Sequence, residues 1–348
     1  MVEQDVELGF LENCQPWQVE SRLFPSKVGG KPAWLNLQKL PSTEHLQCKK
    51  CREPLIFLCQ VYAPYEEEHK NFINNFHRAI FVFICRNVEC CQRNNSDNIK
   101  VFRSNLRRAN KFYPYDPPDE NPQPSFSLAT WLTLCNLCGC LAEKQCSKCK
   151  KVHYCTRHHQ ILDWKEGHKT ECNDSSENIP NSRSWKQSKI LFQEWEIVIE
   201  PEEIDTECFT EEEELEKFKQ LEIDGKIGSM ADIPEEDLES HAVTDSDKVF
   251  SKFQKRVKHN PDQVIRYRRG GQPLWISIEP VPENIPDCEL CKGKRQFEFQ
   301  IMPQMLSQLK ENALDWGILA IYTCENSCFL DDSYHEEFVF KQDVAITN

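Results

Sequence analysis

The chain contains the same module twice, and this constrains the fold more than any other feature. Residues 29–34 (GGKPAW) correspond to residues 270–275 (GGQPLW), and the two Trp positions lie 241 residues apart. Further on, Cys48-x2-Cys51 corresponds to Cys288-x2-Cys291 at an offset of 240, and Val101 corresponds to Val339 at an offset of 238. Matches that recur in order with so little drift indicate an internal duplication. Whatever fold one end adopts, the other end has to adopt it too.

Each copy has the pattern of a small β-rich module. Apolar runs bounded by Gly, Pro or Cys predict short buried strands at Leu55–Tyr62, Ala79–Cys85, Gln296–Met302 and Ile318–Cys324. The paired glycines before each Pro-x-Trp predict a tight turn that enters a strand. A helix is expected at Ser246–Val257, where Val249, Phe250, Phe253 and Val257 share one face.

The charge of the chain is uneven. Residues 194–247 contain 21 Asp and Glu but only three Lys, a net charge of −18, and the whole chain has −14, which leaves +4 for all other residues. A segment this acidic cannot bury enough apolar area to fold alone. It is either a solvated linker or a docking surface for a basic partner, and its charge disfavours contact with nucleic acid.

The start of the acidic segment has a pattern of its own. From Gln193 to Glu200, Trp195, Ile197 and Ile199 alternate with mostly acidic residues. This alternation predicts a half-buried strand. We expect the strand to pair with one of the copies and so to anchor the start of the acidic segment.

Composition disfavours a membrane or secreted protein. No stretch approaches the roughly 18 consecutive apolar residues of a membrane helix, and the first residues lack the basic and apolar regions of a signal peptide. We therefore expect a soluble intracellular protein. Because disulfides are rare in a reducing compartment, metal binding is the expected use of its 19 cysteines.

Eight zinc-ligand side chains lie in four pairs in the middle of the chain: Cys135-x2-Cys138, Cys146-x2-Cys149, Cys155-x3-His159 and His168-x3-Cys172. Zinc takes four tetrahedral ligands and prefers thiolate and imidazole. An x2 pair aims two sulfurs at one ion, and an x3 spacing places two ligands on one face of a helical turn. Eight ligands predict two fully coordinated structural ions, whose binding supplies on the order of 10 kcal/mol of folding energy.

These pairs, together with Tyr154 and Asp163-Trp164, resemble the MYND zinc finger. The resemblance implies interleaved ligands, with Cys135, Cys138, Cys155 and His159 at one ion and Cys146, Cys149, His168 and Cys172 at the other. The chain departs from the usual pattern at His159, where most members have Cys, and in the eight rather than seven residues before His168. Both departures keep four ligands per ion. Cys140 competes with Cys138 without completing the x2 pair, and His153 and His158 are expected at the surface.

Each copy holds four further cysteines. Cys288, Cys291, Cys324 and Cys328 form one predicted zinc site, and Cys48, Cys51, Cys85 and Cys90 form its counterpart, with Cys91 left as an alternative to Cys90. The other interpretation is four small buried core residues, which the recurrence of both pairs in both copies disfavours. We therefore expect four Zn2+ ions per chain. Cys14, Cys59, Cys91, Cys140 and Cys208 remain as packing residues.

The predicted fold class is α+β and mainly β. Two homologous β-rich, zinc-containing modules flank an inserted MYND double-zinc finger and a disordered acidic segment. The expected parts are 1–110 (copy 1), 111–128 (a Pro-rich linker), 129–172 (the finger), 173–190 (a linker), 191–247 (a short strand, then the acidic, largely disordered segment) and 248–348 (copy 2).

With the finger between the copies, the chain resembles the programmed cell death protein 2 family nearly end to end. The resemblance is carried by Val6–Phe10, Phe24–Gly30, Gln60–Pro64, Leu162–Trp164, Ile265–Tyr267, Pro273–Trp275 and Asp315–Leu319. It implies a dedicated chaperone that binds a newly made basic ribosomal protein of the small subunit, the universal S-five family member. The chaperone would keep this client soluble until it joins the pre-40S particle in ribosome biogenesis.

The residues fit such a role. An acidic segment would speed the encounter with a basic ribosomal protein and mask its charge. The β-modules would offer a strand edge or an apolar groove for the specific contacts.

Two other classes of function compete with the chaperone. MYND insertions occur in lysine methyltransferases, but the chain has no Gly-rich cofactor loop, and His77 near Cys85 is the best candidate for a nucleophile and its base. We expect no enzyme activity and no catalytic residue. The alternative is a MYND-finger adaptor in transcriptional regulation, because such fingers bind Pro-rich peptides and residues 135–172 contain seven Lys and Arg against four Asp and Glu.

The expected partners are the basic ribosomal protein and Pro-rich peptides at the finger, with no direct nucleic-acid or membrane contact. The expected location is cytoplasmic, with nuclear shuttling left open. Lys255-Arg256 and Arg268-Arg269 are too short to count as nuclear import clusters.

Overall fold

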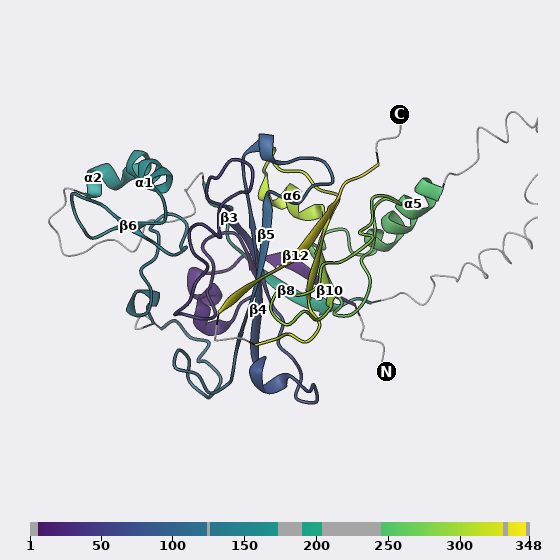
Figure 1. The fold of residues 1–348 in the computed structure, drawn as a ribbon, viewed down its shortest axis with the longest axis horizontal. Coiled ribbons are helices and arrows are strands. Elements are labelled where there is room, and N and C mark those ends of the chain that lie inside the picture. Colours follow the sequence, from purple (N-terminus) through teal and green to yellow (C-terminus); the bar gives the residue numbers. More distant parts are fainter. Residues whose placement is uncertain (1–5, 124–125, 173–189, 204–244, 330–332, 346–348) are drawn as a thin grey trace, which may run out of the picture.

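The computed structural model describes residues 6–123, 126–172, 190–203, 245–329 and 333–345 (Figure 1). The strands are β1 (Glu7–Glu12), β2 (Lys27–Val28), β3 (Ile56–Tyr62), β4 (His77–Ile84), β5 (Ile99–Leu106), β6 (Lys144–Gln145), β7 (His153–Tyr154), β8 (Trp195–Pro201), β9 (Ile265–Tyr267), β10 (Arg295–Ile301), β11 (Ile318–Cys324) and β12 (Tyr334–Gln342). The α-helices are α1 (Arg157–Asp163), α2 (Lys169–Glu171), α5 (Asp245–Lys258) and α6 (Gln304–Leu309). Within these described ranges, no helix is both long and apolar enough to cross a bilayer.

Ten of these strands form one closed antiparallel barrel in the order β1-β8-β2-β3-β4-β5-β12-β11-β10-β9. The two copies meet where β5 pairs with β12, with Ser104 opposite Tyr334 and Val101 opposite Glu337. The prediction of a mainly β fold with two β-rich copies is confirmed. The copies nevertheless share a single sheet, which the sequence did not indicate.

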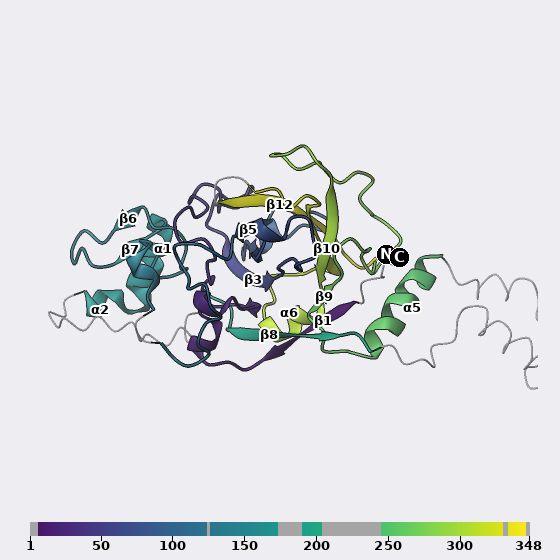
Figure 2. The ribbon, with the colours of Figure 1, turned by 90° about the horizontal axis from the view of Figure 1, so that it is seen from below.

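The barrel closes on its other side by a reciprocal exchange of strands. β1 lies at the start of copy 1 but pairs with β9 of copy 2, where Gly9 lies opposite Ile265. β8 precedes copy 2 but pairs with β2 of copy 1, where Trp195 lies opposite Val28. β1 and β8 also pair with each other and run side by side in Figure 2. The half-buried strand predicted at 193–200 is confirmed, and it ties the start of the acidic segment to the barrel.

In copy 2 the two faces of the barrel wall belong to separate clusters of buried side chains. Successive side chains of a strand point to opposite faces. Leu319 and Ile321 of β11 belong to the core that also contains Ile80 and Val82 of β4. Ala320 and Tyr322, on the opposite face of β11, belong to a separate outer cluster with Phe297. The inner core is therefore built by both copies together.

The duplication extends to individual hydrogen bonds. Gln60 Oε1 accepts a hydrogen bond from Ala33 N at 2.9 Å, and Gln300 Oε1 accepts one from Leu274 N at 2.7 Å. In both copies the side-chain amide nitrogen of the same Gln donates back to the carbonyl of the same residue, at 3.3 and 3.1 Å. The loops that carry Trp34 and Trp275 are thus fixed to the barrel in the same way.

The four predicted strands and the predicted helix are confirmed as β3, β4, β10, β11 and α5. The prediction that the glycine pair enters a strand is wrong, since no strand follows Trp34 and the pair instead ends β2. Gly29 and Gly30 have φ of 68° and 65°, a left-handed conformation that favours glycine and breaks a strand. A Cβ on Gly29 would also collide with the backbone carbonyl of Gln193.

The expected Pro-rich linker packs at its start against copy 1. Phe112 and Tyr113 are buried, and the Tyr113 hydroxyl donates hydrogen bonds to the carbonyls of Trp34 and Leu35 at 3.0 and 2.9 Å. The second expected linker, except for Ile190, and most of the acidic segment lie outside the described residues.

Candidate metal centres

The structure brings the predicted zinc ligands together in four sets. They are Cys48, Cys51, Cys85 and Cys90; Cys135, Cys138, Cys155 and His159; Cys146, Cys149, His168 and Cys172; and Cys288, Cys291, Cys324 and Cys328. Within each set the ligand atoms all lie within 4.8 Å of one another. Residues up to 42 positions apart, such as Cys48 and Cys90, therefore converge on one point.

The spacing of these atoms fits tetrahedral zinc. With Zn–S bonds of about 2.3 Å, neighbouring sulfurs of a tetrahedron lie about 3.8 Å apart. The Sγ–Sγ distances are 3.6 Å for Cys51–Cys85, 3.7 Å for Cys138–Cys155, 3.8 Å for Cys146–Cys172 and 3.5 Å for Cys291–Cys324. A disulfide would need about 2.0 Å, so these thiols are arranged around a common ion position and not bonded to one another.

The backbone supports the same conclusion, because each Cys-x2-Cys pair adopts the same turn. The amide four residues after the first Cys donates to that Cys carbonyl in all four pairs: Arg52 to Cys48 at 3.1 Å, Gly139 to Cys135 at 2.9 Å, Lys150 to Cys146 at 3.0 Å and Lys292 to Cys288 at 2.9 Å. Arg52, Gly139, Lys150 and Lys292 all have positive φ, between 56° and 71°. Such a turn points both sulfurs inward, and three of these positions adopt it without a glycine.

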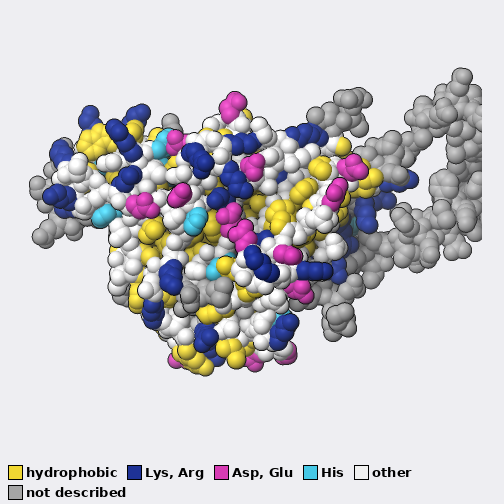
Figure 3. All heavy atoms as spheres, viewed as in Figure 1, with side chains coloured by type: hydrophobic (Ala, Val, Ile, Leu, Met, Phe, Trp, Pro, Cys, Tyr) yellow, Lys and Arg dark blue, Asp and Glu magenta, His cyan; other side chains and the backbone are white. Residues whose placement is uncertain are grey.

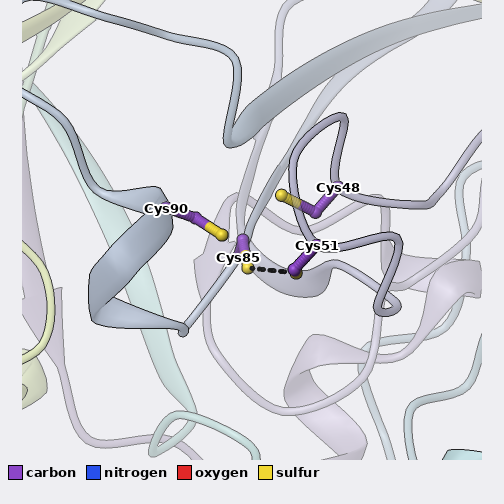
Figure 4. Close-up of side chains that lie close together, drawn as sticks. All are labelled: Cys48, Cys51, Cys85 and Cys90. Carbon is purple, nitrogen blue, oxygen red and sulfur yellow. Dashed lines mark hydrogen bonds between the residues drawn. The ribbon is translucent and has the colours of Figure 1, made fainter.

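In copy 1 the structure places Cys90, not Cys91, with the other three ligands (Figure 4). Cys90 ends the short turn Val88–Cys90, whose Asn87 side chain accepts from Glu89 N. The thiol of Cys91 instead donates to the carbonyl of Asp315 at 3.4 Å. Of the two cysteines that the sequence left open, Cys90 is therefore the one that lies within ligand distance of the other three.

The two histidines of the finger face the sulfurs of their ligand sets with different ring nitrogens. Nδ1 of His159 lies 3.0 Å from Cys155 Sγ and 3.8 Å from Cys135 Sγ. Nε2 of His168 lies 3.6 Å from Cys149 Sγ. Cys155 and His159 are four residues apart at the start of α1, where the Thr156 side chain accepts from His159 N and caps the helix.

A buried polar cluster supports the finger between its two ligand sets. Asp163 at the end of α1 is fully buried and accepts from the Tyr154 hydroxyl at 2.7 Å and from Asn136 Nδ2 at 3.0 Å. Asn136 lies beside Cys135, and Tyr154 precedes Cys155, so Asp163 joins two of the ligand-bearing segments. This explains why Tyr154 and Asp163 accompany the ligands in the sequence.

One thiol in each set has a pKa below its usual value: Cys48, Cys135, Cys146 and Cys324. For Cys324 the main cause is the hydrogen bond from Cys328, and its pKa falls to about 4. For Cys146 burial opposes ionisation, but the backbone amide of Cys149 is the largest of the contacts that lower the pKa, to about 6. Burial raises the pKa of other thiols in the sets, such as Cys90 and Cys172, to about 11. Since zinc binds the thiolate, these thiols would lose their protons only when the metal binds.

The finger docks on copy 1. The indole nitrogen of Trp34 donates to the carbonyl of Gly139 at 2.7 Å, and Lys31 packs against Gly139. Leu137 and Cys138 of the finger belong to the same core cluster as Trp34. The finger therefore completes the core of copy 1, a role that the sequence did not reveal although Trp34 belongs to the repeated motif.

The cysteines and histidines that the sequence analysis left outside the ligand sets differ in how buried they are. Cys59 and Cys140 are buried, Cys14 and Cys91 are half-buried, and Cys208 lies outside the described residues. His158 is exposed and its Nδ1 lies 3.1 Å from Glu53, and His153 is half-buried. His77 begins β4 and Cys85 follows its end, which separates them by about 26 Å at the usual rise of a strand. The structure thus does not bring the two residues of the cysteine-nucleophile hypothesis together.

Comparison with known families matches three parts of the chain. "Programmed cell death protein 2, N-terminal domain" matches residues 5–120, the MYND finger matches 135–172, and "Programmed cell death protein 2, C-terminal putative domain" matches 247–343. Programmed cell death protein 2 of Mus musculus is 44% identical over 358 residues, which cover 98% of this chain and 97% of the mouse protein. The chain belongs to the programmed cell death protein 2 family. It therefore carries a MYND zinc finger, and its other cysteine sets are suited to zinc.

More distant relatives also match. Programmed cell death protein 2-like of Homo sapiens is 27% identical over 340 residues, covering 87% of this chain and 85% of that protein. "Probable 20S rRNA accumulation protein 4" of Schizosaccharomyces pombe is 35% identical over 94 residues, covering 24% of each. No solved structure matches the chain.

Proposed function

We propose that this chain is a dedicated chaperone for a newly made, basic ribosomal protein of the small subunit, the universal S-five family member. It would keep this client soluble for 40S biogenesis. The observation that carries the proposal is the separation of charge, with −18 in residues 194–247 against +4 in all other residues. An acidic partner speeds encounter with a basic protein and suppresses wrong contacts. The name of the fission yeast relative, which refers to 20S rRNA accumulation, is consistent with this role.

The closed barrel narrows the ways in which a client could bind. A free strand edge would allow the client to add a strand, but every barrel strand in the described structure pairs on both sides. Of the two expected modes, the apolar surface is therefore favoured over the strand edge. The acidic segment would supply the charge, and side chains on the outside of the barrel would supply the specific contacts.

We also propose four structural Zn2+ ions per chain, one for each ligand set. Four protein ligands per ion leave no open position for a substrate. This supports a protein without enzyme activity, as does the separation of His77 from Cys85 along β4. We propose a cytoplasmic location, with shuttling to the nucleus as a further possibility to be tested by imaging the tagged chain.

The test is co-expression of the client with the full chain, followed by size-exclusion chromatography in moderate salt. We expect a soluble one-to-one complex. A variant that lacks residues 211–243 keeps α5, which begins at Asp245, and a variant of full length with Gln or Asn at every acidic position of 211–243 separates the effect of charge from that of length. Both should yield less soluble client. Precipitation of the client in the presence of the intact chain would refute the proposal.

A MYND-finger adaptor is the second candidate, favoured by a surface hollow on the finger. Arg157, Gln160, Ile161, Trp164 and Lys165 line it, and Ile161 is 45% exposed. This combination of apolar and basic side chains suits a Pro-rich peptide. Deletion of the whole finger would be a poor test, because the deletion would expose Trp34. Ile161→Asp with Trp164→Ala tests the hollow directly: loss of nuclear partners with full client binding would favour the adaptor.

A further inference from the structure

The duplication allows each copy to serve as a reference for the other. In copy 1, Trp34 is 0% exposed: its ring stacks on Phe81 and Phe83, and its indole N–H donates to Gly139 of the finger. In copy 2, Trp275 is half-buried and contacts Phe340 edge-on at 6.0 Å. The Trp275 indole N–H makes no hydrogen bond within the described part of the chain. The same motif is therefore covered in one copy and uncovered in the other.

The residues that follow each Trp differ in the same way. Leu37 is 0% exposed, whereas Ile278, at the same offset of 241 as the two Trp residues, is 44% exposed. Leu40 packs against the core, whereas its counterpart Val281 is 42% exposed. Val344 is 45% exposed, and the next amide, of Ala345, donates to Ser277 Oγ beside Ile278. Copy 2 therefore exposes apolar side chains where copy 1 buries them.

The cover on copy 1 comes from outside that copy. It consists of the finger, through Leu137 and Cys138, of the segment before the finger, through Phe112 and Tyr113, and of Tyr334 of copy 2, whose ring lies edge-on 5.1 Å from that of Trp34. On copy 2 the corresponding outer cluster contains Phe297, Ala320 and Tyr322, with Trp275, Ile285, Phe338 and Phe340 packed partly exposed against it. All of these residues belong to copy 2. We refer to Trp275, Ile278, Val281, Phe338, Phe340 and Val344 as the Trp275 face.

The loop beside this face is acidic. Residues 278–290 contain Glu279, Glu283, Asp287 and Glu289 and neither Lys nor Arg. All four carboxylates are exposed, and none of them forms an ion pair with another described residue. Figure 3 shows hydrophobic side chains at the surface to the right of centre, with both acidic and basic side chains around them. A complementary partner would present apolar and positively charged side chains together.

We infer that the Trp275 face docks a basic, amphipathic segment of the client, in the position that the finger occupies on copy 1. This inference rests on the proposed function, because it names the surface that the client uses. Apolar side chains of the segment would cover Trp275 and Ile278, and a client carbonyl would accept from the Trp275 indole as Gly139 does from Trp34. Lys and Arg of the segment would pair with Glu279 and Glu283.

Both described ends of the acidic segment lie near copy 2. The segment enters α5 at Asp245, and Phe250 of α5 packs in a cluster that also contains Trp275. At its other end, Glu202 accepts hydrogen bonds from Arg256 of α5 and Arg266 of β9. The described residues on both sides of the acidic segment, Glu202 and α5, therefore both contact copy 2.

Two variants of the full chain test the inference. Ile278→Ser with Val281→Ser removes apolar contact area, and Glu279→Gln with Glu283→Gln removes charge. Matched controls on copy 1 are Ile73→Ser with Tyr115→Ser, at positions 72% and 60% exposed, and Glu67→Gln with Glu68→Gln, also exposed. Thermal unfolding of each variant checks that the barrel is intact. The readout is the dissociation rate of the co-expressed complex, measured by exchange against excess labelled chain at two salt concentrations.

We expect the apolar variant to dissociate at least about tenfold faster, as for truncation of central interface residues. The charge variant should lower the salt concentration at which the complex dissociates. The controls should behave as the unmodified chain. If the unmodified chain binds the client and the face variants bind equally well, the inference is wrong and the proposed function stands. If the controls weaken binding as much as the face variants, the inference is also wrong. If the unmodified chain binds no client, both are wrong.

Discussion

Replacing Glu298 with Gln should weaken the barrel at the contact between its two copies. Glu298 of β10 accepts two hydrogen bonds from Arg78 of β4, at 2.7 and 2.9 Å, so the pair is bidentate and joins copy 2 to copy 1. Arg269 donates to the same carboxylate at 2.9 Å. The Tyr267 hydroxyl also donates to it, at 2.8 Å. The side chains of Arg78 and Glu298 are both 0% exposed. Gln keeps the shape of Glu298 and removes its charge.

The expected loss of stability arises because the substitution leaves the buried cations Arg78 and Arg269 without a counter-charge. Removing one partner of a buried ion pair costs about 3–5 kcal/mol, since the remaining charge stays desolvated. For a folded unit of this size, 1 kcal/mol corresponds to roughly 2–4 °C in Tm. We therefore expect Glu298→Gln to lower Tm by about 6–20 °C.

The contribution of Glu298 is fully present at neutral pH. Burial alone would raise the pKa of this carboxyl, but Arg78 and Arg269 lower it well below its usual range. A carboxylate with a lowered folded pKa stabilises the protein above its unfolded pKa of about 4.3 and loses this effect as the pH falls through the folded pKa. An assay at pH 7.5 therefore measures the whole contribution.

The assay is thermal unfolding followed by near-UV circular dichroism, with zinc in the buffer so that metal loss does not intervene. Glu336→Gln is the matched control. Glu336 is 42% exposed and lies 3.6 Å from Lys100, and a surface pair of this kind contributes at most about 1 kcal/mol. Equal Tm values for Glu298→Gln and Glu336→Gln would refute the argument that the buried pair holds the copies together.

Three further predictions follow. Cys288→Ser should reduce zinc from four ions per chain to three by elemental analysis of the purified protein, and a count of two in the unmodified chain would refute both all-cysteine sites. Trp34→Phe should leave the buried Gly139 carbonyl without its donor, at a cost of about 1–3 kcal/mol, so limited proteolysis should cut the finger faster, whereas Trp131→Phe, at a position 42% exposed, should change little. Burial, with Arg108 adding to its effect, lowers the pKa of His77 to about 4, so the unfolded state binds the proton first and stability falls as pH drops from 6.5. The free energy of unfolding of His77→Gln, from urea titrations between pH 7 and 5.5, should depend on pH less steeply by up to about 1.4 kcal/mol per unit, and an unchanged slope would contradict this reasoning.

The metal centres could be predicted from the sequence because their information is local. A Cys-x2-Cys pair specifies a turn that aims both sulfurs at one point, and the four pairs do adopt that turn. The duplication then indicated which distant pairs belong together, because Cys48 with Cys85 recurs as Cys288 with Cys324. The residues near Cys90 and Cys91 in the sequence do not indicate which of the two joins the ligand set. The choice depends on Asp315 of copy 2, whose carbonyl accepts from Cys91.

The buried charge of Glu298 could not be predicted from the sequence, because the residues of β10 alternate as in a strand with one face in solvent. In β10, Phe297, Phe299 and Ile301 alternate with Glu298 and Gln300, which is typical of a strand with one solvated face. The structure buries both faces, and a bulge between Phe297 and Phe299 shifts the register. Arg78, the partner of Glu298, lies 220 positions away, so periodicity along one strand could not have indicated the pair.

The exchange of β1 and β8 explains why two homologous halves act as one unit. Residues 1–120 alone would lack β8, so β2 would keep only β3 as a partner, and residues 247–343 alone would lack β1, so β9 would keep only β10. Two identical copies in such an arrangement would expose identical faces. The insertion of the finger after copy 1 breaks this symmetry, because it covers Trp34 and leaves Trp275 open. The repeated Trp motif thus has a structural role in copy 1, whereas copy 2 retains the exposed apolar Trp275 face, on which we propose that a basic client docks.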